Sequence, residues 1–281
     1  MTVREAMGRG VRALRDAGVP DAGVDAMLLL SHVTGLRRTE VSLRGAENLT
    51  EEQEQRFLSL LLSRASRRPL QYVLGEQCFF GLDFLVDERV LIPRPETETL
   101  CEIALGFLKE LPSPTALDLG TGSGAIAIVL QHECPEARVT AVDISPDALA
   151  VVTENARRNR ADIRFLQGDL FAPVAGERFD CIVSNPPYVE RDARQTLPAE
   201  VLWEPELALD GGEDGLAFYR AIAREAPAHL FPDGLLCVEI GETQARAVCG
   251  LLEGRGMDRV AVHRDLSGKD RVVCARAVSF P

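Results

Sequence analysis

The chain has 281 residues, of which 46% are apolar and 26% charged, a balance typical of a soluble globular protein long enough for two domains. Its net charge of -12 argues against broad, sequence-independent binding to nucleic acid, because a phosphate backbone requires a positive surface. The 7 cysteines and 4 histidines form no disulfide or metal-ligand pattern, and no apolar run has the length of a membrane span. We therefore expect a metal-free cytoplasmic protein.

The first part of the chain, residues 1–74, predicts a small helical bundle. The capping-box patterns Thr2-x-x-Glu5 and Thr50-x-x-Gln53 each begin a stretch with helical apolar spacing. Between them, Val24 to Val33 predicts a mostly apolar helix that ends at Gly35. We expect these residues to form a separate domain.

A change of period follows, and it predicts a linker over residues 75–94. Residues favourable to strands surround Gly81 in the stretch Gln77 to Val86, which indicates a short β-hairpin. Pro93-Arg94-Pro95 then interrupts the chain before a predicted helix from about Glu96 to Leu111. The second domain is expected over residues 95–281.

Strands and helices alternate through this second domain, which predicts an α/β fold with a doubly wound, mostly parallel sheet. The helix after Asp143 has a clear beginning, with Ser145 as N-cap and Pro146 at the first helical position. The predicted strands are Ala116–Leu119, Val139–Asp143, Ile163–Gln167, Cys181–Ser184, Leu235–Ile240, Arg259–His263 and Arg271–Ala277.

A glycine-rich loop follows the first of these strands and leads into a helix. It contains Gly120, Thr121, Gly122, Ser123 and Gly124. Glycines allow a tight turn and close approach to a ligand, and the helix N-terminus offers unpaired N–H groups. Asp143, 19 residues past Gly124, ends the next strand, where its carboxylate can accept hydrogen bonds from a ribose. The loop alone fits either an S-adenosylmethionine site or a dinucleotide site.

Asp169 and Leu170 follow the third strand and fall at the same carboxyl edge of the sheet, where open α/β folds bind ligands. The carboxylate of Asp169 can accept a hydrogen bond from an adenine amino group, and Leu170 can pack on the ring. An ordinary turn at the end of a strand explains these two residues equally well.

The tetrapeptide Asn185-Pro186-Pro187-Tyr188 ends the fourth strand on that edge. A methyl transfer onto a planar nitrogen with two hydrogens needs two hydrogen-bond acceptors that hold the NH2 group. The side-chain oxygen of Asn185 and the backbone carbonyl of Pro186 can supply them, and Tyr188 can pack against the planar group. We predict Asn185, Pro186 and Tyr188 as catalytic residues, and the whole tetrapeptide as the substrate-binding segment.

These residues resemble the class I methyltransferases that modify planar NH2 groups. More narrowly, the chain resembles the HemK/PrmC family, the N5-glutamine methyltransferases of peptide chain release factors. The resemblance runs through most of the chain and is most specific in Pro93-Arg94-Pro95-Glu96-Thr97-Glu98 and in the Asn-Pro-Pro-Tyr string. Further matches are Arg68 to Gly75, Asp118 to Gly124, Glu204-Pro205, Asp214-Gly215-Leu216 and Asp265-Leu266.

The resemblance implies a Rossmann-like class I methyltransferase domain with a seven-stranded, mostly parallel sheet, an N-terminal helical bundle that grips the release factor, and a short β-hairpin linker. It implies S-adenosyl-L-methionine as cofactor and the glutamine of a Gly-Gly-Gln loop as substrate. Residues Asn185 to Tyr188 would hold that glutamine. The residues implied at the cofactor are Gly120, Thr121, Gly122, Ser123, Gly124, Asp143, Asp169, Leu170 and Asn185.

Three alternatives remain open from the residues. A sister enzyme that methylates a glutamine of a large-subunit ribosomal protein would share the catalytic motifs. An adenine-N6 DNA methyltransferase also acts on a planar NH2 group, but the acidic charge and the lack of a basic recognition segment weigh against it. An NAD-dependent oxidoreductase would leave Asn185 to Tyr188 unexplained.

Overall fold

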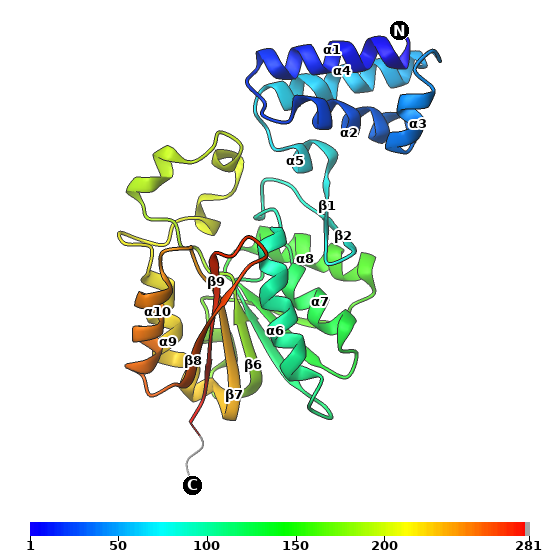
Figure 1. The fold of residues 1–281 in the computed structure, drawn as a ribbon. Helices are drawn as coiled ribbons and strands as arrows, with labels where there is room; N and C mark the ends of the chain where they lie inside the picture. The colour runs from blue at the N-terminus through cyan, green and yellow to red at the C-terminus, as the bar shows by residue number, and fades with distance from the viewer. Residues whose placement is uncertain (279–281) are drawn as a thin grey trace. The chain divides into compact units, whose positions relative to one another are not determined.

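The structure, a computed structural model, describes residues 1–278 apart from the side chain of Arg194. The chain forms two compact units (Figure 1). The smaller unit comprises Met1–Glu76 and Pro198–Trp203, and the larger one comprises Gln77–Leu197 and the chain from Glu204 onward.

The smaller unit is a bundle of helices, as the capping patterns predict. Thr2 and Thr50 both form complete capping boxes, with Glu5 and Gln53 as their partners. Leu14, Leu29, Leu30 and Phe57 are fully buried in its core. The helices are α1 (Val3–Asp16), α2 (Ala22–Thr34), α3 (Arg38–Leu43), α4 (Glu51–Ala65) and α5 (Leu70–Leu74).

A partly buried ion-pair cluster joins the segment Pro198–Trp203 to this bundle. Arg64 of α4 donates to Asp25 of α2 at 2.7 Å and to Glu200 at 3.1 Å. Arg67 donates to both oxygens of Glu200, at 2.8 and 2.7 Å, and this pairing lowers the pKa of Glu200 to about 2. The charge of Asp25 inside a mostly apolar helix is therefore matched by Arg64.

The predicted hairpin is present as β1 (Glu76–Phe79) and β2 (Leu82–Leu85). Phe80 and Gly81 make the turn with φ values of 51° and 77°, the double positive φ of a tight hairpin turn. The helix predicted from Glu96 is divided into a short 3-10 turn, η1 (Pro95–Thr97), and α6 (Glu98–Leu108).

The larger unit contains a seven-stranded sheet within the described residues, with the order β5-β4-β3-β6-β7-β9-β8. Strand β9 is antiparallel to β7 and β8, and the other pairings are parallel. The predicted mostly parallel α/β sheet is confirmed. The strands are β3 (Thr115–Leu119), β4 (Arg138–Asp143), β5 (Ile163–Gln167), β6 (Phe179–Ser184), β7 (Leu230–Glu239), β8 (Asp258–Arg264) and β9 (Asp270–Arg276).

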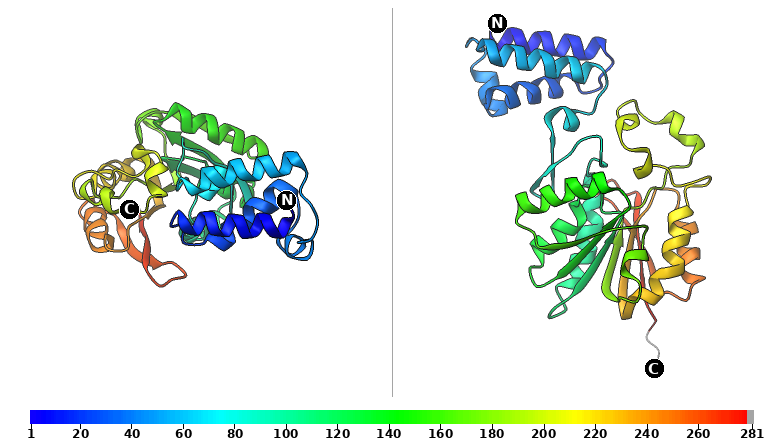
Figure 2. Two further views of the ribbon diagram at one scale, coloured as in Figure 1. Left: turned by 90° about the horizontal axis from the view of Figure 1, so that it is seen from above. Right: turned by 180° about the vertical axis from the view of Figure 1, so that it is seen from behind.

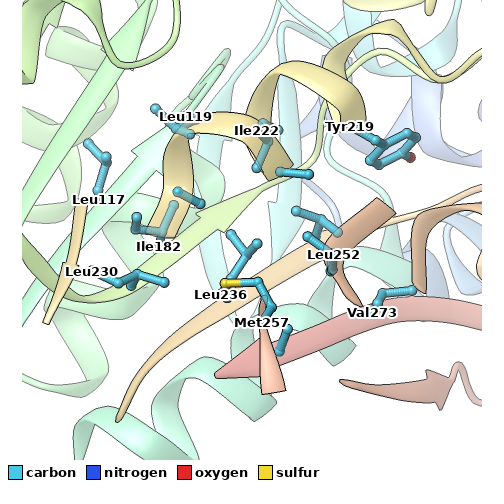
Figure 3. Packing of buried hydrophobic residues seen from close by; sticks show 14 of the residues in the cluster. Leu117, Leu119, Ile182, Tyr219, Ile222, Leu230, Leu236, Leu252, Met257 and Val273 are labelled. Atoms are coloured by element: carbon cyan, nitrogen blue, oxygen red, sulfur yellow. The ribbon is translucent and has the colours of Figure 1, made fainter. Parts of the chain in front are cut away.

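Helices cover both faces of the sheet. Figures 1 and 2 show α6, α7 (Ala125–Glu133) and α8 (Pro146–Asn159) on one face, and α9 (Ala217–His229) and α10 (Ala245–Glu253) on the other. Figure 3 shows side chains from the sheet packed against α9 and α10. Leu117, Ile182 and Leu236 come from the sheet, Ile222 from α9 and Leu252 from α10. This burial of apolar side chains holds the sheet rigid beneath its loops.

The strand order brings the loops after several parallel strands together at one edge of the sheet. Strands β3, β4, β5 and β6 run parallel, so the loops after them emerge on one side. The chain winds outward from β3 through β4 to β5 and then returns to place β6 beside β3. Such a reversal of strand order opens the crevice in which α/β folds bind ligands.

Candidate active site

A cavity of about 320 Å³ lies at this carboxyl edge, inside the larger unit. Pro93, Arg94 and Thr97 of the proline-rich signature line it together with the loops after the parallel strands. Among the predicted site residues, the lining consists of Gly120, Thr121, Gly122, Ser123, Asp143, Asp169, Leu170, Asn185 and Pro187.

The glycine loop between β3 and α7 uses its glycines in two ways. Gly120 and Gly122 have φ values of 70° and 54°, and a Cβ at either position would meet no atom within 4 Å. The positive φ at these two positions favours glycine, and the lack of side chains leaves open space beside the cavity. Gly124 does not line the cavity; a Cβ there would lie 2.2 Å from Cγ2 of Val152 in α8. Close packing of the loop on α8 therefore requires the third glycine.

Asp143 ties the loop after β3 to the loop after β4. Its carboxylate accepts from the backbone N–H of Gly122 at 2.8 Å and from that of Ser145 at 2.9 Å. Ser145 in turn caps α8 by accepting from Ala148 at 3.2 Å, as predicted. The carboxylate is thus held rigidly at the cavity wall, with lone pairs left for a ligand hydroxyl.

Leu170 lies in a strained backbone conformation at the same wall. Its φ is 43°, a left-handed value that costs a non-glycine residue about 1–3 kcal/mol and that is common at ligand sites. Its side chain also packs partly against the apolar core beneath α9 and α10. The neighbouring Asp169 lines the cavity beside it.

The four residues of the tetrapeptide after β6 do not all line the cavity. Asn185 and Pro187 line the cavity, whereas Pro186 is buried and Tyr188 is half-buried against the core beneath α9 and α10. The backbone carbonyl of Tyr188 accepts from Gln244 at 3.1 Å. Burial raises the pKa of Tyr188 to about 12, so its hydroxyl is neutral at physiological pH.

Relatives of known identity match the chain nearly end to end. Residues 5–75 match the PrmC N-terminal domain model, and residues 101–212 match the methyltransferase small domain model. The release factor glutamine methyltransferase of Cereibacter sphaeroides is 47% identical over 98% of this chain and 99% of its own length. That of Deinococcus radiodurans is 42% identical over the same shares, 98% and 99%. This chain belongs to the release factor glutamine methyltransferase family.

Membership of the release factor glutamine methyltransferase family confirms the resemblance drawn from the sequence motifs and the prediction of an enzyme. The fold itself is shared more widely. A crystal structure of a methyltransferase from Pyrococcus furiosus superposes with a TM-score of 0.54 at 21% identity, over 71% of this chain and 91% of that one. The predicted class I methyltransferase fold, with its N-terminal helical bundle and hairpin, is confirmed.

Two buried acids at the site were assigned no role from the sequence, although Asp118 begins the matched stretch Asp118 to Gly124. Asp118 of β3 is fully buried behind the glycine loop and accepts from the hydroxyl of Thr121 at 2.6 Å, while its Oδ1 has no hydrogen-bond partner. Burial raises the pKa of Asp118 to about 7. Glu239, at the end of β7, accepts from the hydroxyl of Thr97 at 2.6 Å. Asp118 is the one charged residue of β3, and Glu239 is the one charged residue in the apolar stretch from Leu235 to Ile240. A lone charge in an apolar stretch was the signal that the sequence offered.

Two further lining residues also went unassigned from the sequence. Arg94 pairs with Glu204, whose side chain is nearly fully buried. Burial raises the pKa of Glu204 in spite of that partner. Phe218 at the beginning of α9 adds an aromatic surface to the cavity. The proline-rich signature thus contributes a guanidinium to the cavity, a role that its sequence alone did not indicate.

No group of three or more His, Cys, Asp and Glu side chains within residues 1–278 is placed to hold a metal ion. No helix in that part of the chain is long and apolar enough to cross a membrane. The prediction of a site that works without metal stays a prediction.

Proposed function

We propose that this enzyme transfers a methyl group from S-adenosyl-L-methionine to the side-chain amide nitrogen, N5, of the glutamine in the Gly-Gly-Gln loop of peptide chain release factors. The observation that carries the proposal is Asn185, whose amide lies at the cavity wall with its nitrogen tied to Thr97 at 3.3 Å. The relatives named release factor glutamine methyltransferase support the choice of substrate.

The cavity fits the cofactor by the chemistry of its lining. Gly120 to Ser123 would accommodate the methionine part at the start of α7, and Asp143 would accept from the ribose hydroxyls. Asp169 and Leu170 would contact the adenine. The orphaned Oδ1 of Asp118 behind the loop is a further acceptor for an ordered water or a ligand N–H. When bound, the sulfonium supplies a methyl group that is already activated for transfer.

For the substrate, the chain's task is to hold a planar NH2 group. The side-chain oxygen of Asn185 and the backbone carbonyl of Pro186 would accept its two hydrogens and favour pyramidalisation of the nitrogen. Pro187 would form part of the wall beside it. Tyr188 would support this segment from the core side. The methylated nitrogen is a strong acid and loses its proton readily, so no strong base is required.

We assign a different role to each part of the chain. We assign recognition of the release factor to residues 1–74, a linking role to residues 75–94 and methyl transfer to residues 95–281. Because release factors act in translation termination, we place the enzyme in the cytoplasm. Recognition of this partner needs no direct contact with nucleic acid, consistent with the net charge of -12.

A methyl-transfer assay tests the substrate. Purified enzyme with labelled S-adenosylmethionine is offered a release factor, a large-subunit ribosomal protein and adenine-containing DNA in parallel. We expect label only on the release factor, and loss of that label in Asn185→Ala. Preferential labelling of the ribosomal protein or of DNA would replace the proposed substrate.

A further inference from the structure

The amide of Asn185 can serve as an acceptor only in one of its two orientations. Rotation by a half turn would exchange Oδ1 for Nδ2 and present a donor to the substrate's NH2 group. Two donors facing each other repel, so the wrong orientation would prevent binding of the glutamine in a reactive pose. Something in the protein must therefore select the orientation.

The neighbours of Asn185 distinguish the two ends of its amide. Nδ2 donates to Oγ1 of Thr97 at 3.3 Å, and the side chain of Asn185 lies near enough to the carboxyl group of Glu239 to act on its pKa in the lowering direction. Thr97 gives its single hydroxyl hydrogen to Glu239 Oε2 at 2.6 Å, so its oxygen can only accept from Asn185. Within the described residues, no hydrogen bond engages Oδ1 of Asn185.

We propose that Thr97 and Glu239 are positioning residues that hold the amide of Asn185 with Oδ1 toward the cavity, where it accepts from the NH2 group of the substrate. This inference rests on the proposed function. It also gives the proline-rich signature a chemical role, because Thr97 ends η1 within that signature.

Glu239 is itself held in place from several sides. It is 1% exposed at the end of β7, and its backbone carbonyl accepts from the hydroxyl of Tyr219 at 2.8 Å. The titratable and charged groups around its carboxyl group are Glu96 of η1, Cys101 of α6, Tyr188 after β6, Tyr219 of α9 and Arg271 of β9.

The arrangement also makes a prediction for pH. Burial raises the pKa of Glu239 to about 7. The ionised carboxylate can only accept, so it fixes Nδ2 of Asn185 inward. The protonated acid can donate, so it no longer distinguishes the two orientations of the amide. Turnover should therefore rise with pH through the ionisation of Glu239 and level off above it.

The decisive variant is Glu239→Gln, whose own amide can donate to Asn185 and turn it round. We expect kcat to fall about ten- to a hundredfold, because misplacing a contact to the reacting group has effects of this size. Affinity for S-adenosylmethionine should stay unchanged, and the rise of kcat with pH should disappear. Glu242→Gln is the matched control, since Glu242 is half-exposed and pairs with Lys269.

A second pair of variants tests the same role independently, in case Glu239→Gln fails to fold. Thr97→Val removes the hydroxyl at nearly constant volume and should lower kcat, whereas Thr97→Ser keeps the hydroxyl and should restore it. The sharpest readout uses Asn185→Asp, in which both side-chain oxygens are acceptors. In that background Glu239→Gln should raise kcat instead of lowering it. The carboxylate of Glu239 repels the carboxylate introduced at position 185, whereas the amide of a glutamine can donate to it.

The positioning role is overturned if Glu239→Gln keeps the wild-type kcat and pH profile, or if it lowers kcat equally in the Asn185→Asp background. Wild-type methyl transfer to the release factor is measured in the same series. Its absence would overturn the proposed substrate, whereas its presence with an insensitive Glu239→Gln would overturn the positioning role alone.

Discussion

Replacing Gly124 by alanine should destabilise the methyltransferase unit, although this glycine belongs to the glycine loop beside the cavity. Gly124 has a φ of 83°, and an added Cβ would lie 2.2 Å from Cγ2 of Val152 and 3.1 Å from Cδ1 of Ile128. The left-handed backbone costs an alanine about 1–2 kcal/mol. Overpacking against α8 costs a further amount of about 1–3 kcal/mol. For a unit of this size, such a loss lowers the unfolding temperature by about 4–20 °C.

Gly122→Ala is the matched comparison. Gly122 has a φ of 54°, but its added Cβ would meet nothing within 4 Å, so only the backbone term of about 1–2 kcal/mol applies. Because Gly122 lines the cavity, this variant should also lose affinity for S-adenosylmethionine.

Thermal unfolding followed by circular dichroism and calorimetric titration with S-adenosylmethionine separate the two effects. Gly124→Ala should melt well below Gly122→Ala, and Val152→Ala in the Gly124→Ala background should recover part of the loss. The reasoning is refuted if Gly124→Ala melts with the wild type, or if Gly122→Ala is the less stable of the two.

Four other variants test buried and half-buried polar side chains. Asp25→Asn should cost about 3–5 kcal/mol of unfolding free energy, measured in urea, because it leaves Arg64 short of its buried partner; an unchanged midpoint would contradict this. The pKa of Asp118 is raised from 3.8 to about 7, so the native state keeps a proton that the unfolded state has lost. Its contribution to stability therefore falls as pH rises between these values, and Asp118→Asn should flatten that part of the urea-derived stability profile, whereas an equally steep profile would argue against it. Tyr188→Phe should keep wild-type kcat in the methyl-transfer assay because the hydroxyl stays neutral, and Tyr188→Ala should lose it; a large loss in Tyr188→Phe would assign the hydroxyl a chemical role.

Local signals in the sequence predicted much of the fold. The strand from Ile163 to Gln167 was predicted with its observed bounds, and Ser145 caps α8 as expected. Strand β7 was predicted to begin at Leu235 but begins at Leu230. Pro232, Asp233 and Gly234 indicate a turn, and Asp233 does adopt a φ of 60°. The ladder nevertheless continues past them, because pairing with β6 resumes after an irregularity.

Long-range contacts, both in the site and in the helical bundle, could not be predicted from short stretches of sequence. Thr97 and Glu239 meet across 142 positions of the chain, and Arg64 and Glu200 across 136. Such pairs depend on the order of strands in the sheet and on the return of the chain to the helical bundle, which no short motif encodes. The glycine loop, Asp143 and Asn185 were accessible because each follows a strand whose neighbours are parallel.

The atom that receives the methyl group is the most direct test of the proposed chemistry. Release factor is incubated with the enzyme and S-adenosylmethionine, digested and mapped by tandem mass spectrometry with fragmentation that locates the added methyl. The cavity and Asn185 predict a single methyl on the amide nitrogen of the glutamine in the Gly-Gly-Gln loop. A methyl on a carboxylate, on another side chain or on a backbone nitrogen would contradict the account of Asn185 as a clamp for a planar NH2 group.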